Sequence, residues 1–176
     1  MKDCTHLKYN FNYKDNTQKA VAVIFWILAI LCMAAIFMLS NQTGDESKEL
    51  SENVRGLFFK LIGNILDSFI VRKFAHFFEY LALAFLLSCA LFMTRKRFSP
   101  IPAFAASLIY SVSDEIHQYF IPERACRVFD VFVDSCGAVL GILIFAALLA
   151  LINLIVLKRK NKVKNRHRPT TKYLAK

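Results

Sequence analysis

Residues 20–39 read AVAVIFWILAILCMAAIFML and contain no charged side chain. Twenty residues at a helical rise of about 1.5 Å cover roughly 30 Å, which is the thickness of the hydrocarbon core of a bilayer. The run is longer than the apolar part of a cleaved signal peptide, and the MLSNQTG at its end contains no small-residue cleavage site. We therefore expect a transmembrane helix over Ala20–Leu39 that is retained in the chain.

Three more apolar runs of helical length follow, at Phe74–Met93, Ile101–Phe120 and Val128–Leu157. The chain is 56% hydrophobic and 20% charged, which excludes a disordered basic chain and argues against an ordinary soluble nucleic-acid-binding module. We predict an all-α membrane protein. Its four transmembrane helices form one domain over residues 20–157, between an N-terminal segment (residues 1–19) and a basic tail (residues 158–176).

The positive charges predict the orientation of these helices. The chain has a net charge of +10, and the N-terminal segment, the Arg95–Arg97 turn and the tail together carry 16 of its 23 Lys and Arg residues. By the positive-inside rule, both termini are cytoplasmic in a multi-pass protein of the bacterial cell membrane. The tail follows a span directly and lacks interleaved aromatic residues, so we interpret it as a lipid-facing anchor and expect no nucleic-acid partner.

The first outer loop, between the first two spans, contains apolar residues at helical spacing from Leu50 to Phe69. Thr43 and Glu46, just ahead of them, have the spacing of a capping box, in which each side chain bonds the other residue's backbone N–H. We expect an amphipathic helix at the membrane interface here.

Polar residues occur at one depth in three of the spans. His76 and Glu79 share a helical face, as do Asp114 and His117, and all four lie within about 10 Å of the predicted outer boundary. Asp134, in the last span, lies near that boundary. An acid at the bilayer centre costs about 2.5–3.5 kcal/mol, so such residues indicate a functional site in preference to simple interhelical hydrogen bonding.

Other residues near these spans have more ordinary interpretations. We interpret Gly137, Gly141 and Tyr80 as packing residues, with the glycines forming a small-residue seam. For Arg72 and Lys73, snorkelling to lipid head groups and anion binding both stay open.

The motifs FMLSNQ, RKFAHFFEYLAL and SDEIHQYFIPERACRVFDVFVDSCGAVLG resemble those of the VanZ-like family of small bacterial membrane proteins. The resemblance extends from Ser40 to Gly141. The chain departs from the family pattern at Glu123, where Gly is usual, and at Asp134, where Asn is usual, and both departures change the local charge. The resemblance implies a role on lipid head groups or lipid-linked wall precursors, with an association with teicoplanin resistance.

We therefore expect an intramembrane enzyme that acts on phosphate-linked lipid head groups or lipid-linked cell-wall precursors at the outer leaflet. The alternative is a non-catalytic protein that binds a wall-precursor lipid or a glycopeptide and limits drug access. The expected catalytic residues are His76, Glu79, Asp114 and His117, with His117 as base or nucleophile oriented by Asp114. The expected substrate-binding residues are Lys73, Glu115, Gln118, Arg124 and Asp130. The many oxygen ligands allow a divalent cation as cofactor, but no spaced metal motif specifies one.

Overall fold

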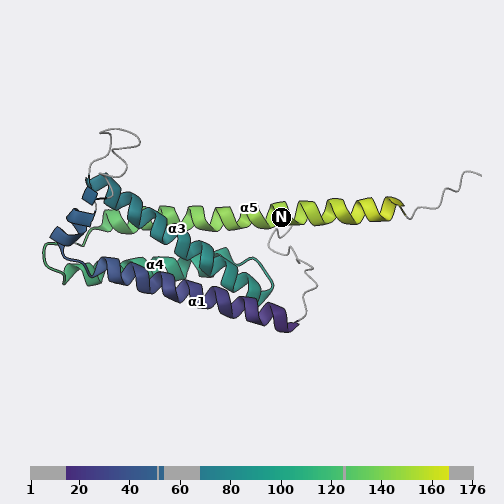
Figure 1. Cartoon of the computed structure of the whole chain (residues 1–176), viewed down its shortest axis with the longest axis horizontal. Helices are drawn as coiled ribbons and strands as arrows, with labels where there is room; N and C mark the ends of the chain where they lie inside the picture. The colour runs from purple at the N-terminus through teal and green to yellow at the C-terminus, as the bar shows by residue number, and fades with distance from the viewer. Residues whose placement is uncertain (1–14, 51, 54–67, 125, 167–176) are drawn as a thin grey trace, which may run out of the picture. The chain divides into compact units, whose positions relative to one another are not determined.

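A computed structural model describes residues 15–50, 52–53, 68–124 and 126–166, and within these residues all regular structure is helical (Figure 1). The helices are α1 (Asp15–Ser40), α3 (Ser68–Arg95), α4 (Pro100–Tyr119) and α5 (Val128–Arg166), with a shorter helical stretch at residues 44–50 and 52–53. The chain divides into two compact units, Met1–Phe145 and Ala146–Lys176. The prediction of an all-α fold is confirmed.

Three of the described helices are long and apolar enough to cross a membrane, over Asn16–Ser40, Ile70–Arg95 and Val128–Arg159. The third predicted span, Ile101–Phe120, corresponds to α4, which has the length of a span at 20 residues. Its last two turns carry Asp114, Glu115 and His117 and lower its hydropathy, so its passage through the membrane stays a prediction.

Local sequence signals fix several helix ends. Pro100 starts α4, where its missing N–H is not needed. The Thr43 backbone N–H donates to Glu46 Oε2 at 2.8 Å, and the Glu46 N–H donates to Thr43 Oγ1 at 3.3 Å, which confirms the predicted capping box. Most of the predicted amphipathic helix falls on residues 54–67 and lies outside the described residues.

In the first unit, α1 packs along α3 and α4 around a core of small and aliphatic side chains that includes Ala29, Ala84 and Leu87. At one end, Gln18 Nε2 donates to the Met93 carbonyl oxygen at 2.8 Å and ties the start of α1 to the end of α3. Helices α1 and α3 therefore run antiparallel.

The interface between α3 and α5 depends on two glycines. A Cβ added at Gly137 would overlap the Phe77 carbonyl oxygen, and one added at Gly141 would overlap the Leu81 carbonyl oxygen. The backbones can approach this closely only because both residues lack a side chain. This contact confirms the predicted small-residue seam, and it brings the start of α5 against the polar face of α3.

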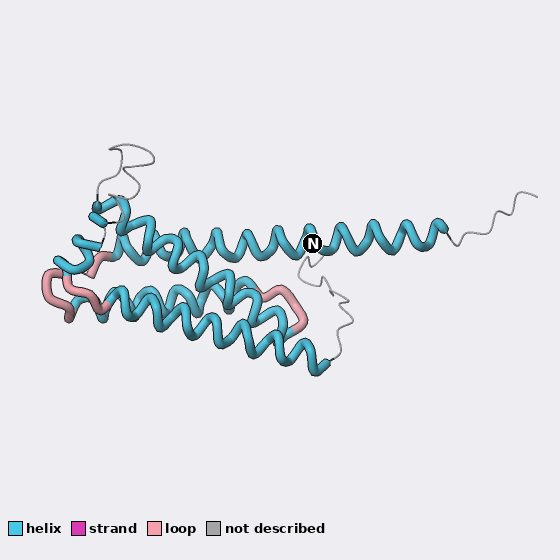
Figure 2. The backbone as a smooth tube through the Cα atoms, in the orientation of Figure 1, coloured by secondary structure: helices cyan, strands magenta, loops and turns pink. Residues whose placement is uncertain are grey.

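The loop from α4 to α5 lies at the opposite end of the bundle from Gln18 and Met93, where α1 ends and α3 begins (Figure 2). The Gly44 N–H donates to the Pro122 carbonyl oxygen at 3.2 Å, and Arg124 Nη2 donates to the Leu39 carbonyl oxygen at 3.0 Å. Glu123, between these contacts, has a left-handed backbone with φ of 61°. Glycine adopts this conformation without strain, which is a physical reason for a Gly at this position in the family pattern.

Candidate functional site

A cavity of about 530 Å³ lies at this end of the bundle, between α1, the short helix after it, α3, α4 and the loop that follows α4. Most of its wall is apolar and includes Phe74 and Phe78, which are 52% and 58% exposed. Its polar lining residues are Ser40, Gln42, Ser47, Arg72, His76, Glu79, Asp114 and Arg124. An apolar pocket with a few convergent polar groups is the usual form of a ligand site.

Two guanidinium groups, those of Arg72 and Arg124, line this cavity. Burial lowers the pKa of Arg124, and the positive charge of Arg72 lowers it further, while nearby carboxylates oppose both effects. The Arg124 Nε atom is buried and has no hydrogen-bond partner among the described residues. Two arginines at one apolar wall favour an anion with several oxygens, such as a phosphate.

Two carboxylates, from Glu79 and Asp114, reach the same cavity. The Gln118 side-chain amide donates to Asp114 Oδ2 at 3.0 Å, one helical turn away on α4. Gln118 therefore orients a cavity carboxylate, and it is not itself among the lining residues. His76, Glu79, Asp114 and Arg124, which we predicted as site residues, thus come together at one cavity.

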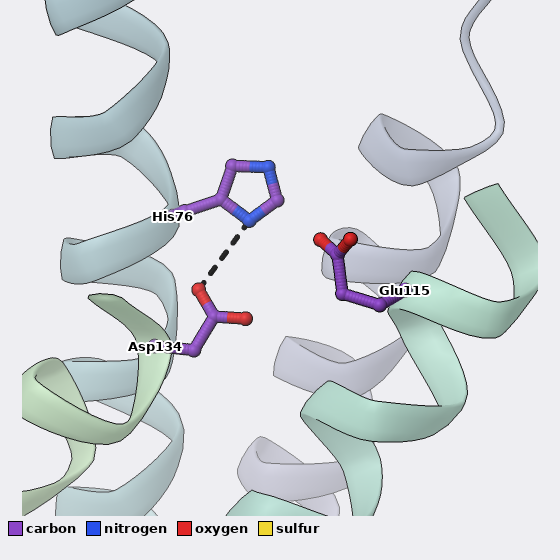
Figure 3. Close-up of side chains that lie close together, drawn as sticks. All are labelled: His76, Glu115 and Asp134. Atoms are coloured by element: carbon purple, nitrogen blue, oxygen red, sulfur yellow. Dashed lines mark ion pairs between the residues drawn. The ribbon is translucent and has the colours of Figure 1, made fainter. Parts of the chain in front are cut away.

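His76 also belongs to a buried cluster with Glu115 and Asp134, contributed by α3, α4 and α5 (Figure 3). His76 Nδ1 lies 3.4 Å from Asp134 Oδ1, and one ligating atom from each of the three side chains lies within 4.8 Å of the others. The Ser111 hydroxyl donates to Asp134 Oδ2 at 2.6 Å, and the Arg127 backbone N–H donates to Glu115 Oε2 at 2.8 Å. The cluster is therefore held in place from two sides.

Lys73 and Asp130 form an ion pair between α3 and α5, and their side chains are only 11% and 8% exposed. The Lys73 ammonium also lies 5.9 Å from the centre of the Phe129 ring. We predicted both residues to bind substrate. In the structure the two side chains neutralise each other and join two helices, so their role in substrate binding stays a prediction. Arg72 lines the cavity, which favours anion binding over snorkelling for this residue.

His117 faces α1, where its ring stacks on Phe37 with ring centres 4.8 Å apart. The Nε2 atom of His117 is buried without a hydrogen-bond partner among the described residues. His117 is not among the residues that line the cavity. Asp114, the residue expected to orient His117, accepts a hydrogen bond from Gln118. The catalytic role of His117 stays a prediction. His76 is the histidine that both lines the cavity and belongs to the buried cluster.

The sequence reasoning did not include Asp134, Ser111 or Arg72 among the site residues. A signal for Asp134 was present, because it lies one helical turn after Asp130 on the face that also carries Gly137 and Gly141. Ser111 lies one turn before Asp114 and Glu115, so its position on the inner face of α4 was also readable.

The sequence model of the VanZ/LLP1 family matches residues 25–156 of the chain. This range contains every residue of the cavity and of the buried cluster. No curated protein and no solved structure matches the chain.

Proposed function

The chain belongs to the VanZ/LLP1 family, as its polar motifs indicated, and from this premise we propose that it is an intramembrane enzyme acting on phosphate-linked lipid head groups. The proposed substrates are phospholipids or lipid-linked cell-wall precursors in the outer leaflet, and the proposed reaction is hydrolysis or head-group exchange. Such chemistry on wall precursors would link the protein to glycopeptide resistance.

The observation that supports this proposal is the composition of the cavity wall. A lipid phosphate needs an apolar path for its chains and a cationic end for its head group. Phe74 and Phe78 supply an exposed apolar wall, and Arg72 and Arg124 supply two guanidinium groups in the same cavity. Arginine binds phosphate oxygens through paired N–H donors, which also fixes the orientation of the phosphate.

The proton-transfer groups required for such a reaction lie beside the proposed phosphate position. Glu79 and Asp114 can take a proton from water or from an acceptor alcohol, whose oxygen then attacks phosphorus. The bond from phosphorus to the head-group oxygen breaks, and we assign to His76, which lines the same cavity, the donation of a proton or hydrogen bond to the leaving oxygen. The two arginines would stabilise the negative charge that develops on the phosphoryl oxygens.

The test is head-group release by the detergent-purified protein, measured by mass spectrometry on phospholipids and prenyl-linked phosphates. We expect turnover of at least one class, and a loss of about 100-fold or more in Glu79→Gln, since general acid–base catalysis contributes about 10²–10⁴-fold. Glu49→Gln is the matched control, because Glu49 is exposed on the short helix and does not line the cavity.

Binding without turnover would support the alternative of a non-catalytic protein that holds a wall-precursor lipid or a glycopeptide. In that case a resistance or lipid phenotype in cells would survive the Glu79→Gln substitution. Loss of the phenotype in Glu79→Gln, together with its retention in Glu49→Gln, would support the enzyme.

A further inference from the structure

The buried cluster behind the cavity carries a further inference, which does not rest on the proposed reaction. We propose that His76, Glu115 and Asp134 bind one divalent cation of the Zn²⁺ or Mn²⁺ type.

The three side chains are nine-tenths or more buried, with exposures of 7% for His76, 1% for Glu115 and 0% for Asp134. Each nevertheless has an atom without a hydrogen-bond partner among the described residues, namely His76 Nδ1, Glu115 Oε1 and Asp134 Oδ1. His76 Nδ1 and Asp134 Oδ1 are the two atoms of the 3.4 Å contact, which is an ion pair only when the imidazole is protonated. A buried polar atom without a partner costs about 1–3 kcal/mol, and more where the group is charged. Three such atoms directed at one small volume indicate that a ligand satisfies them together (Figure 3).

The charge of the cluster indicates what that ligand is. With a neutral imidazole, the two carboxylates place two negative charges in a buried volume, and burying an unpaired charge is strongly unfavourable. The ammonium of Lys73, on the neighbouring turn of α3, is engaged with Asp130. A single divalent cation would neutralise both carboxylates and accept the imidazole lone pair.

The separations between the ligand atoms fit such an ion. Metal–nitrogen and metal–oxygen bonds of about 2.0–2.2 Å place neighbouring ligand atoms roughly 3–3.5 Å apart. The 3.4 Å between His76 Nδ1 and Asp134 Oδ1 agrees with this spacing but is too long for a good hydrogen bond. The other separations between ligand atoms are at most 4.8 Å, so ion binding would draw the third ligand atom in by no more than about 1.5 Å.

The donor set decides the class of ion. One imidazole nitrogen with two carboxylates suits zinc, manganese or ferrous iron, whereas magnesium and calcium prefer oxygen ligands alone. Two ligands also have the outer hydrogen bonds that orient metal-binding carboxylates, from Ser111 to Asp134 and from the Arg127 backbone to Glu115. An ion on His76 Nδ1 would leave the hydrogen on Nε2, which fixes that nitrogen as a donor.

The test measures the ion and not the reaction. The full chain is purified in detergent, stripped with a chelator and titrated with Zn²⁺, Mn²⁺ and Co²⁺ alone, with elemental analysis for stoichiometry and the Co²⁺ absorption spectrum for ligand geometry. We expect one ion per chain. Glu115→Gln and Asp134→Asn keep the side-chain shape and remove the charge. Each should weaken ion binding by more than about 10-fold, because changing a residue that only hydrogen-bonds to a metal ligand already costs about that much.

Asp114→Asn is the matched control, because Asp114 is buried on the turn that carries Glu115 but lies outside the cluster. It should bind the ion as the unaltered chain does, and an equal loss in this variant would overturn the ligand assignment. Absence of stoichiometric binding to the unaltered chain, or unchanged affinity in both Glu115→Gln and Asp134→Asn, would overturn the proposal.

Where a variant fails to fold, X-ray absorption on the zinc-loaded, unaltered chain still decides the question. We expect scattering from one imidazole and from oxygen neighbours, with no sulfur. A spectrum without an imidazole would overturn the site. Head-group release measured on the same stripped and reloaded samples separates the two proposals, because the ion can bind whether or not the cavity is catalytic.

Discussion

Gly137→Ala is the substitution that most directly tests how the fold positions the site. Gly137 lies on α5, one turn after Asp134, and faces Phe77, the residue next to His76. An added Cβ would overlap the Phe77 carbonyl oxygen, whereas ordinary carbon–oxygen contacts are about 3.3–3.6 Å. The two backbones must therefore separate by about 1 Å, since backbone atoms on both sides leave no flexible group to yield.

The expected cost has two parts. Overpacking of a close-packed contact costs about 1–3 kcal/mol of stability. A separation of about 1 Å also moves Asp134 Oδ1 away from His76 Nδ1. Their distance rises from 3.4 Å to more than about 4 Å, the limit for an ion pair. We expect a lower unfolding temperature in detergent, a loss of cation binding of about 10-fold or more, and a matching loss of head-group release.

Thermal unfolding followed by circular dichroism, with cation titration of the same sample, measures both parts. Cys136→Ala is the control, because Cys136 is the preceding residue of α5, is exposed and is a free thiol. A Gly137→Ala protein with unaltered stability and unaltered cation affinity would refute the claim that the glycine seam sets the geometry of the cluster.

Three further outcomes follow from the structure. Lys73→Met should destabilise the protein by about 3 kcal/mol, since it leaves Asp130 buried without its partner, and the double variant with Asp130→Leu should recover most of the loss in a detergent unfolding assay. Glu123→Gly should stabilise it by about 1 kcal/mol because the left-handed backbone strains any residue with a Cβ; an unchanged or lower unfolding temperature would contradict this. Arg124→Gln should reduce head-group release by about 10–100-fold, the equivalent of one charge-assisted hydrogen bond of about 1.5–3 kcal/mol, with little change in cation affinity.

The helices and the end of the bundle that carries the site were predictable from the sequence, because charge-free runs and polar depth depend only on position along each helix. The capping box at Thr43 and Glu46 was predictable for the same local reason. Which polar groups meet depends on how each helix rotates about its axis. That rotation follows from packing between helices, such as the approach of α5 to the carbonyl oxygen of Phe77 at Gly137.

The neighbours Asp114 and Glu115 illustrate this dependence. Adjacent residues on a helix point about 100° apart, so one carboxylate reaches the cavity and the other reaches Asp134 and His76. His117, two residues further, contacts Phe37 instead. The motif brought all three residues to the same depth, but it could not divide them among a cavity, a buried cluster and an aromatic contact.

The one-sided placement of the ionisable groups has an electrical consequence. Residues 20–40, 80–94, 100–113 and 135–145 contain no charged side chain, which corresponds to about 15–20 Å or more of helix on the side away from the site. Hydroxyl groups in this part, such as those of Ser88 and Ser107, donate to carbonyl oxygens of their own helix. If the helices cross a membrane as predicted, this half of the bundle offers no charged group that could carry water, protons or cations through it. The acids and histidines would then be reached from the opposite surface alone, and the site would leave the ion gradients of the cell intact.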